Sequence, residues 1–273
     1  ILQTSVNDGS SWSNDDHATN DGTGLSTAIT LTDDTTSEFH IRITDDAGNS
    51  GTAHEQAYTH DDTVPTVTIA LSTSNSNSAQ AKSGDVVTLT MTPSETLQGN
   101  PACTILGEAG SASAGSGTHI CALTLSGNEA AGDVETNGFS VTTAGNFVDV
   151  AGNNGAADTS ADSGAVNVDF TAPTVTVTIL DISADTGTSA TDWETSTAVQ
   201  TFTATLSAAA APSDIVYVSV NAGSSWTDVT SSVTGNPDID LSVSITLTDD
   251  TTSAVHVKVT DAAGNDGAAA TQA

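Results

Sequence analysis

Nine aspartates are the residues best suited to chemistry in this sequence, because they gather where one repeated unit passes into the next. Carboxylates, Asn amides and loop carbonyls supply the oxygen ligands that Ca²⁺ requires, roughly six to eight per ion. We therefore expect calcium as the cofactor at these joints. The candidate metal ligands are Asp45, Asp46, Asp61, Asp149, Asp169, Asp181, Asp185, Asp192 and Asp261.

Three of these aspartates open the motif Asp-x-Ala-Gly-Asn, which is also a good tight turn. Glycine accepts a positive φ, and Asp or Asn side chains bond to their own backbone. The copies are Asp45–Asn49, Asp149–Asn153 and Asp261–Asn265. The turn and calcium interpretations both remain open, and the charge of the chain favours the metal.

The charge is extreme: 34 acidic residues stand against 3 basic ones, a formal net charge of −31 in 273 residues. Nucleic acid and anionic membrane surfaces would repel such a chain, whereas bound cations would relieve the repulsion along it. No apolar run approaches the roughly 20 residues that span a bilayer. We expect no nucleic-acid partner and no membrane insertion in this segment.

Enzyme chemistry finds little support in the remaining residues. No glycine-rich loop precedes a helix, and no Ser, His and Asp arrangement stands out from a background rich in Ser and Asp. His40 and His256 alternate with apolar neighbours on expected strands, so we expect both to face solvent. The prediction is a protein that is not an enzyme.

Two cysteines flank a connection rich in Gly, Ser and Ala. We expect Cys103 and Cys121 to form a disulfide between neighbouring strands, which indicates an oxidising exterior. Two free buried thiols are the alternative. A zinc site that adds His119 fits none of the usual structural spacings.

Internal repeats give the domain organisation. The unit is about one hundred residues long, as in immunoglobulin-like domains. Three domains follow: residues 1–60, the C-terminal half of a domain; 61–168, a complete domain with the disulfide; and 169–273, a nearly complete domain. The repeats pair Val6–Trp12 with Val220–Trp226, Ile29–Ser37 with Ile245–Ser253, and the joint Asp61–Ile69 with Asp169–Val177.

Alternation of apolar and polar residues predicts β-strands throughout, and no segment has helical periodicity. The fold class is all-β, with tandem immunoglobulin-like antiparallel β-sandwich domains arranged end to end. The first domain lacks its opening strands, which come from the rest of a longer chain or from a neighbouring subunit. The alternating runs are Phe39–Ile43, Val67–Leu71, Val87–Met91, Val175–Ile179, Phe202–Leu206 and Val255–Val259.

The third domain resembles the bacterial immunoglobulin-like repeats of giant extracellular surface adhesins and related cell-surface proteins. The resemblance extends to the surviving half of the first domain, whereas the middle domain keeps only the joint and its Asp149–Asn153 motif. It implies long stalks that frequently bind Ca²⁺ where domains meet. The residues that carry it are Ile179–Gly187, Thr191–Trp193, Phe202–Leu206, Val218–Trp226 and Asp261–Asn265.

We therefore predict a non-enzymatic structural repeat segment of a large extracellular protein, an adhesin stalk or surface-layer fibre stiffened by calcium. Its partners are neighbouring domains of the same protein or identical subunits, with host or surface ligands at a distant tip. One alternative is a subunit that assembles into an extracellular filament or sheath by β-strand complementation. Another is a carbohydrate-binding accessory module of a secreted enzyme, using Trp12, Trp193 and Trp226.

Overall fold

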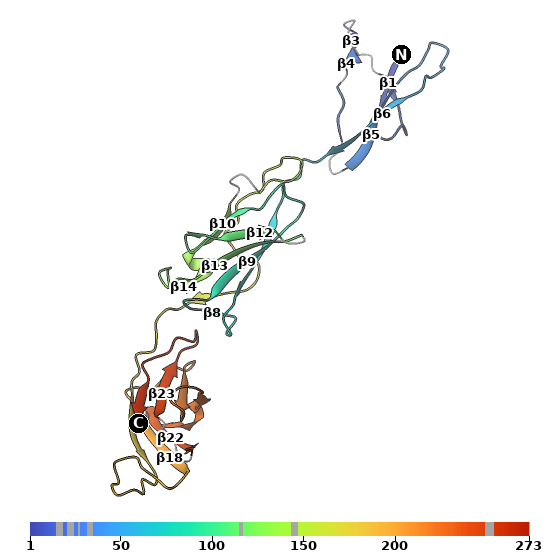
Figure 1. The fold of residues 1–273 in the computed structure, drawn as a ribbon. Helices are drawn as coiled ribbons and strands as arrows, with labels where there is room; N and C mark the ends of the chain where they lie inside the picture. The colour runs from blue at the N-terminus through green and yellow to red at the C-terminus, as the bar shows by residue number, and fades with distance from the viewer. Residues whose placement is uncertain are drawn as a thin grey trace.

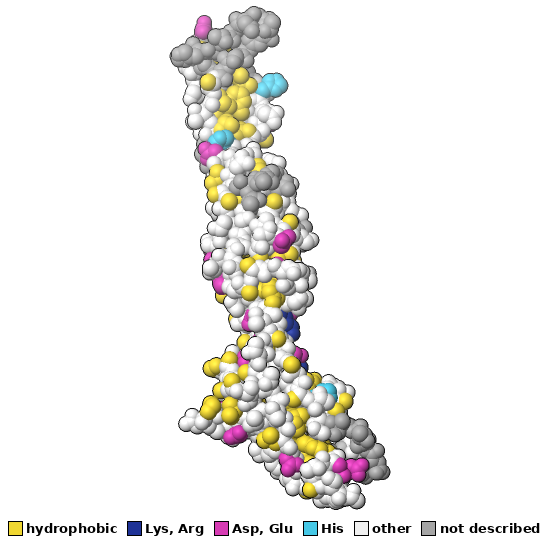
Figure 2. All heavy atoms as spheres, turned by 90° about the vertical axis from the view of Figure 1, so that its left-hand side faces the viewer, with side chains coloured by type: hydrophobic (Ala, Val, Ile, Leu, Met, Phe, Trp, Pro, Cys, Tyr) yellow, Lys and Arg dark blue, Asp and Glu magenta, His cyan; other side chains and the backbone are white. Residues whose placement is uncertain are grey.

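The computed structural model describes residues 1–14, 19–20, 25–26, 28–31, 35–114, 117–142, 147–248 and 254–272. The repeated stretches 29–37 and 245–253 thus lie partly outside the described residues. Strands dominate, and the helices among the described residues are α1 (Val134–Asn137) and the 3₁₀ turn η1 (Thr230–Ser232). Neither is long enough to cross a membrane. The strands form three groups along an elongated molecule, here called the first (1–60), middle (61–168) and third (169–272) segments (Figures 1 and 2).

The first segment is built on one antiparallel sheet in the order β2-β1-β5-β6. Alternate residues of β5 point to one face: Phe39 and Ile41 are half-buried, and Ile43 is 64% exposed. This apolar face is therefore only partly covered by the described residues. The strands are β1 (Leu2–Ser5), β2 (Ser13–Asn14), β3 (Thr19–Asn20), β4 (Leu25–Ser26), β5 (Thr35–Ile43) and β6 (His54–His60), with β3 and β4 paired separately.

The middle segment encloses its own hydrophobic core. One sheet has the order β12-β13-β9-β7, a second has β11-β10-β15, and a third has β14-β16-β8, in which β16 and β8 run parallel. On β9, Val87, Leu89 and Met91 are fully buried while the intervening residues are partly exposed. The strands are β7 (Val67–Thr73), β8 (Gln80–Ala81), β9 (Val86–Pro93), β10 (Ala102–Ile105), β11 (Glu108–Ala109), β12 (Ser111–Ala114), β13 (His119–Thr124), β14 (Gly132–Asp133), β15 (Phe139–Thr142) and β16 (Asn167–Val168).

A disulfide between Cys103 and Cys121 ties this core together, with a Cα–Cα distance of 6.3 Å. We expected it to join neighbouring strands. It joins β10 to β13, which belong to different sheets. A Cβ on Gly110 would lie 2.1 Å from the Cys121 sulfur, so glycine is required where the chain passes the bridge.

The third segment contains two four-stranded sheets that enclose a second core, in the orders β17-β18-β22-β21 and β20-β19-β23-β24. Phe202 of the first sheet and Val257 of the second are completely buried in it. The strands are β17 (Val177–Ile182), β18 (Val199–Leu206), β19 (Ile215–Ser219), β20 (Thr227–Asp228), β21 (Val233–Gly235), β22 (Asp238–Thr246), β23 (Val255–Thr260) and β24 (Ala270–Gln272).

The expected all-β class is confirmed, and every alternating run lies wholly or mostly in a strand. The repeat also holds in three dimensions, because β5 and β23 occupy equivalent positions. Their surroundings differ: Val255, Val257 and Val259 of β23 are at most 4% exposed, since the sheet containing β18 covers them. Their counterparts on β5 are more exposed, and among the described residues no second four-stranded sheet covers them.

Candidate functional site

Each Asp-x-Ala-Gly-Asn stretch forms a closed turn around its first carboxylate. The carboxylates of Asp45, Asp149 and Asp261 each accept hydrogen bonds of 2.8–2.9 Å from the backbone and side-chain N–H groups of the Asn four residues later. The glycine of each turn has a positive φ of 88°, 106° and 87°. The turn interpretation therefore accounts for the motif in all three places.

The Asn of the turn also holds the linker that leads into its own segment. Asn153 donates from Nδ2 to the carbonyl of Asp61 at 2.9 Å, and Asn265 does the same to Asp169 at 2.9 Å. These bonds join positions far apart in the sequence. The motif thus fixes the chain at the point where it enters the middle and third segments.

Hydrogen bonding keeps the carboxylates of Asp45 and Asp149 ionised. The side-chain amide of Asn49 is the main reason that the pKa of Asp45 lies below its ordinary value. For Asp149, burial acts to raise the pKa, but the hydrogen bonds from Asn153, Gly152 and Ala151 outweigh it and the pKa is lowered. Both turns therefore carry full negative charges at neutral pH.

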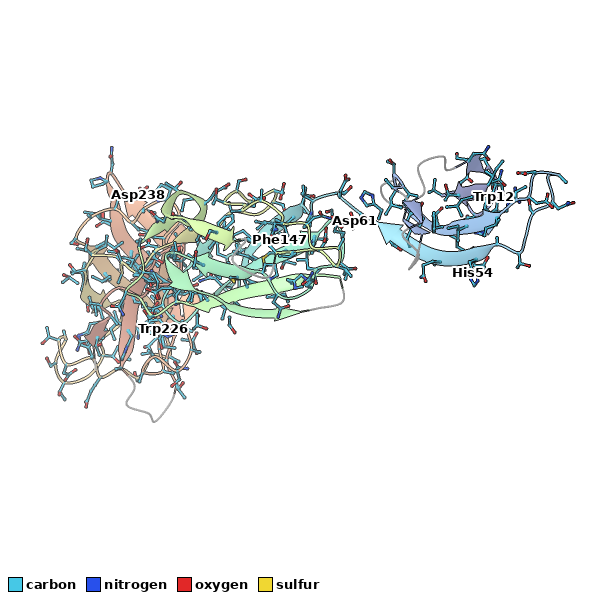
Figure 3. The ribbon with its side chains drawn as sticks, turned by 90° about the horizontal axis from the view of Figure 1, so that it is seen from above. Trp12, His54, Asp61, Phe147, Trp226 and Asp238 are labelled. Atoms are coloured by element: carbon cyan, nitrogen blue, oxygen red, sulfur yellow. A yellow bond between two sulfur atoms is a disulfide. The ribbon has the colours of Figure 1, made fainter. Side chains whose placement is uncertain are left out.

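Three carboxylates meet at the first joint, the linker between β6 and β7 that begins at Asp61, which Figure 3 labels. Asp61, Glu95 and Asp149 each bring one oxygen to within 4.8 Å of the others. Asp149 is 1% exposed, and the other two are half-buried. Because Ca²⁺ binds oxygens at about 2.3–2.6 Å, ligands on opposite sides of one ion lie about 5 Å apart. The three residues fit a shared calcium ion, to which loop carbonyls would add ligands.

The second joint, between β16 and β17, is held by direct protein contacts. Asn75 donates to the carbonyl of Ala263 at 2.8 Å, and Asn77 to that of Ala262 at 3.1 Å. Lys82 donates from Nζ to the carbonyl of Gly264. The two connections that flank β8 thereby bind the third Asp-x-Ala-Gly-Asn turn, and protein donors occupy the carbonyls that a cation would otherwise use.

The predicted calcium ligands therefore separate into groups. Asp61 and Asp149 meet, with Glu95, which the sequence analysis missed. Asp169 and Asp261 are joined through Asn265 at the second joint. Among the described residues these last two do not belong to a group of three possible ligands.

Asp45 and Asp46 lie far from Asp61. They lie in the turn between β5 and β6, and the seven residues of β6 separate that turn from the joint. A strand of this length spans about 20 Å. The expectation that all three lie at one joint is wrong for these two.

Asp181, Asp185 and Asp192 were also expected near a joint, and this placement is wrong for the second joint. Asp181 lies near the end of β17, and the other two lie in the loop between β17 and β18. Because β17 runs away from the linker, this loop lies at the end of the third segment remote from the middle one (Figure 1). Asp185 there accepts a hydrogen bond from the backbone of Trp193 at 3.1 Å.

The tryptophans act as packing residues. Trp12 meets the ring of His40 edge-on at 6.2 Å, and the Arg42 guanidinium lies 3.9 Å from its ring centre. Trp226 makes the equivalent edge-on contact with a histidine at 6.2 Å. Trp193 packs against the third core, and all three rings are partly buried.

His40 is buried, with 9% of its surface exposed, so the expectation that it faces solvent is wrong. The hairpin turn at Gly9 and the ring of Trp12 cover it. His256, its counterpart on β23, is partly exposed.

No protein-family model matches the sequence, and no curated protein matches it. Among solved structures, the chain is similar to SGBP-B of the Bacteroides ovatus mixed-linkage glucan utilization locus, solved with a mixed-linkage heptasaccharide. The identity is 11% and the TM-score 0.22, over 97% of this chain and 55% of the other. The chain thus spans about half the length of that protein. So distant a likeness carries no functional argument.

We predict that the carboxyl groups of Asp45 and Asp149 titrate below the ordinary Asp pKa of about 3.9. A lowered folded-state pKa adds stability that is fully present above the unfolded-state value and is lost as the pH falls through the folded-state value. Carbon-13 NMR titration of the two carboxyl groups measures this directly. Titration at or above the ordinary value would contradict the closed turns.

Proposed function

We propose that this chain is a non-enzymatic structural repeat segment of a large extracellular cell-surface protein, of the adhesin-stalk or surface-layer type. Its segments are immunoglobulin-like β-sandwiches set end to end, related to the repeats of bacterial surface adhesins. Calcium stiffens the first joint. The partners are neighbouring domains of the same protein, and a distant tip carries any host or surface ligand.

The second joint carries this proposal. A flexible linker would let two segments swing, whereas here the entry linker is bonded to the turn and the turn is bonded to the preceding segment. Three donors from the two connections that flank β8 reach three successive carbonyls, Ala262, Ala263 and Gly264. Such a contact fixes the orientation of the third segment relative to the middle one. A rigid spacer requires a fixed orientation, whereas a loosely tethered binding module does not.

The carboxylates at the first joint support the calcium part of the proposal. Asp61 directly follows β6, the last strand of the first segment, while Glu95 and Asp149 lie in the body of the middle segment, so a shared ion would fix the linker that joins the two. Three like charges within 4.8 Å repel one another strongly where Asp149 is shielded from water. A divalent cation removes that repulsion and joins the segments.

Two further observations fit a structural protein outside the cell. A hollow of about 170 Å³ between the sheets of the third segment is lined by Val, Ile, Ser and Thr and by no titratable side chain. The disulfide of the middle segment suits an oxidising environment.

Self-assembly by β-strand complementation is the second candidate, and the apolar face of β5, which the described residues cover only in part, favours it. In the third segment, the sheet containing β17 and β18 covers the equivalent face of β23. Strands from a second copy of the chain would complete the first segment in the same way. Ile43, 64% exposed, would lie inside that contact.

Calcium is expected to raise the melting temperature of the chain and to narrow the spread of its end-to-end length. Glu95→Gln should reduce both effects, because it removes one charged ligand. Calorimetry and small-angle X-ray scattering, with Ca²⁺ and with EDTA, measure them. Asp192→Asn is the matched control and should respond as the wild type does. Identical melting and scattering of the wild type in Ca²⁺ and EDTA would contradict the calcium joint.

For strand complementation, Ile43→Asp should abolish concentration-dependent association, because it places a charge on the apolar face of β5 without opening a core. Sedimentation velocity over a range of concentrations measures the association. Val150→Asp is the control, since Val150 is 70% exposed in the middle segment. A wild-type chain that stays monomeric at all concentrations would exclude assembly of this chain alone.

A further inference from the structure

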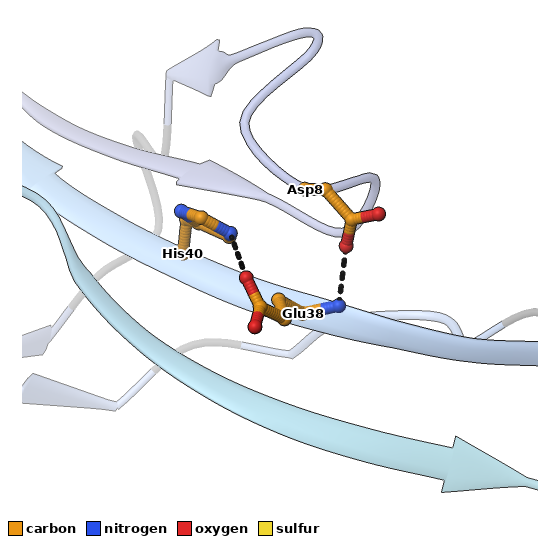
Figure 4. A group of neighbouring side chains, drawn as sticks. All are labelled: Asp8, Glu38 and His40. Carbon is orange, nitrogen blue, oxygen red and sulfur yellow. Dashed lines mark hydrogen bonds and ion pairs between the residues drawn. The ribbon is translucent and has the colours of Figure 1, made fainter.

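A second group of possible metal ligands lies in the first segment, away from the joints (Figure 4). Asp8 comes from the hairpin turn between β1 and β2, and Glu38 and His40 come from the same face of β5. One ligand atom from each lies within 4.8 Å of the other two. Asp8 is held in place because its Oδ1 accepts a hydrogen bond of 2.6 Å from the backbone N–H of Glu38.

The imidazole of His40 points into this group with its Nε2 atom. This atom has no contact with solvent and no hydrogen-bond partner among the described residues. The atom faces Glu38 Oε2 at 3.3 Å, within ion-pair range but without hydrogen-bond geometry. A buried polar atom left without a partner costs free energy, so it points to a ligand between the side chains.

We propose that Asp8, Glu38 and His40 bind a divalent transition metal of the Zn²⁺ type. Two carboxylates and one imidazole suit zinc, whereas Ca²⁺ prefers oxygen ligands alone. Ligands about 2.0 Å from a tetrahedral zinc lie about 3.3 Å from each other. The separation of 3.3 Å between His40 Nε2 and Glu38 Oε2 matches this edge.

Glu55 completes the arrangement from the neighbouring strand. It is paired directly with His40 across β5 and β6, and its Oε2 lies 3.9 Å from Nδ1, the other ring nitrogen. Metal-binding histidines usually donate their second N–H to a carboxylate, which orients the ring. A small side-chain movement would bring the Glu55 carboxylate from 3.9 Å to hydrogen-bond distance of His40 Nδ1.

The third segment provides an internal comparison. His256 keeps the strand position and the tryptophan contact of His40, yet all three surrounding carboxylates are missing. Ala222, Ala254 and Thr271 stand where the first segment has Asp8, Glu38 and Glu55. The histidine therefore does not need the acids in order to pack against tryptophan.

The first and third segments differ in how much apolar surface they bury, and this difference explains why a metal would stabilise the first one. The third segment has a complete core, while the apolar face of β5 is only partly covered. A metal clip between the β1–β2 turn and β5 stabilises a sheet that has less burial to rely on.

Titration of the full chain with ZnCl₂ in excess CaCl₂, followed by isothermal calorimetry, tests the assignment. We expect one zinc site that calcium does not compete away. His40→Gln should weaken it by at least about 100-fold, and Glu55→Gln by about 10–100-fold, as outer-shell partners do. His256→Gln is the matched control and should leave the affinity unchanged.

A variant that gains the site avoids any ambiguity from misfolding. Ala222→Asp with Ala254→Glu adds both carboxylates beside His256, in a segment whose core is intact, and should raise the stoichiometry to two zinc ions per chain. Zinc binding that survives His40→Gln in the folded chain, or that excess Ca²⁺ abolishes, would place the ion on carboxylates alone and overturn the assignment.

Discussion

The hydrogen bonds of the Asp-x-Ala-Gly-Asn turns are the interaction on which the arrangement of the molecule depends. In the middle and third segments, the Asp carboxylate organises the Asn, and the Asn side chain holds the linker entering that segment. At the second joint, the carbonyls of the same turn are bound by the preceding segment. One short motif thus closes a turn, fixes a linker and orients two neighbouring segments.

The scarcity of positive charge makes the position of each basic residue informative. Of three basic residues in a chain with a net charge of −31, Lys82 binds the carbonyl of Gly264 at the second joint. Arg42 and Lys258 occupy equivalent strand positions and lie over Trp12 and Trp226. At the first joint, by contrast, the carboxylates of Asp61, Glu95 and Asp149 come together. The two joints therefore differ in the chemistry that lines them.

Sequence alone predicted the strands well, because alternation such as Val255, Val257 and Val259 reports directly which face is buried. The sequence predicted less well which residues form the site, because the distance between two side chains depends on which strands pair and in which register. Glu95 reaches the first joint because β7 and β9 pair with Val67 opposite Pro93, a register the sequence does not state. The burial of His40 depends on a hairpin turn folding over β5. The Cys103–Cys121 bridge likewise depends on which sheet each strand joins.

The most direct test of the turn as an orienting device is the distance distribution between one spin label on the middle segment and one on the third, measured by electron–electron dipolar spectroscopy in the wild type and in Asn265→Ala. The account predicts a narrow distribution in the wild type that broadens in the variant while both cores stay folded. A distribution that is broad in both proteins, or equally narrow in both, would contradict it.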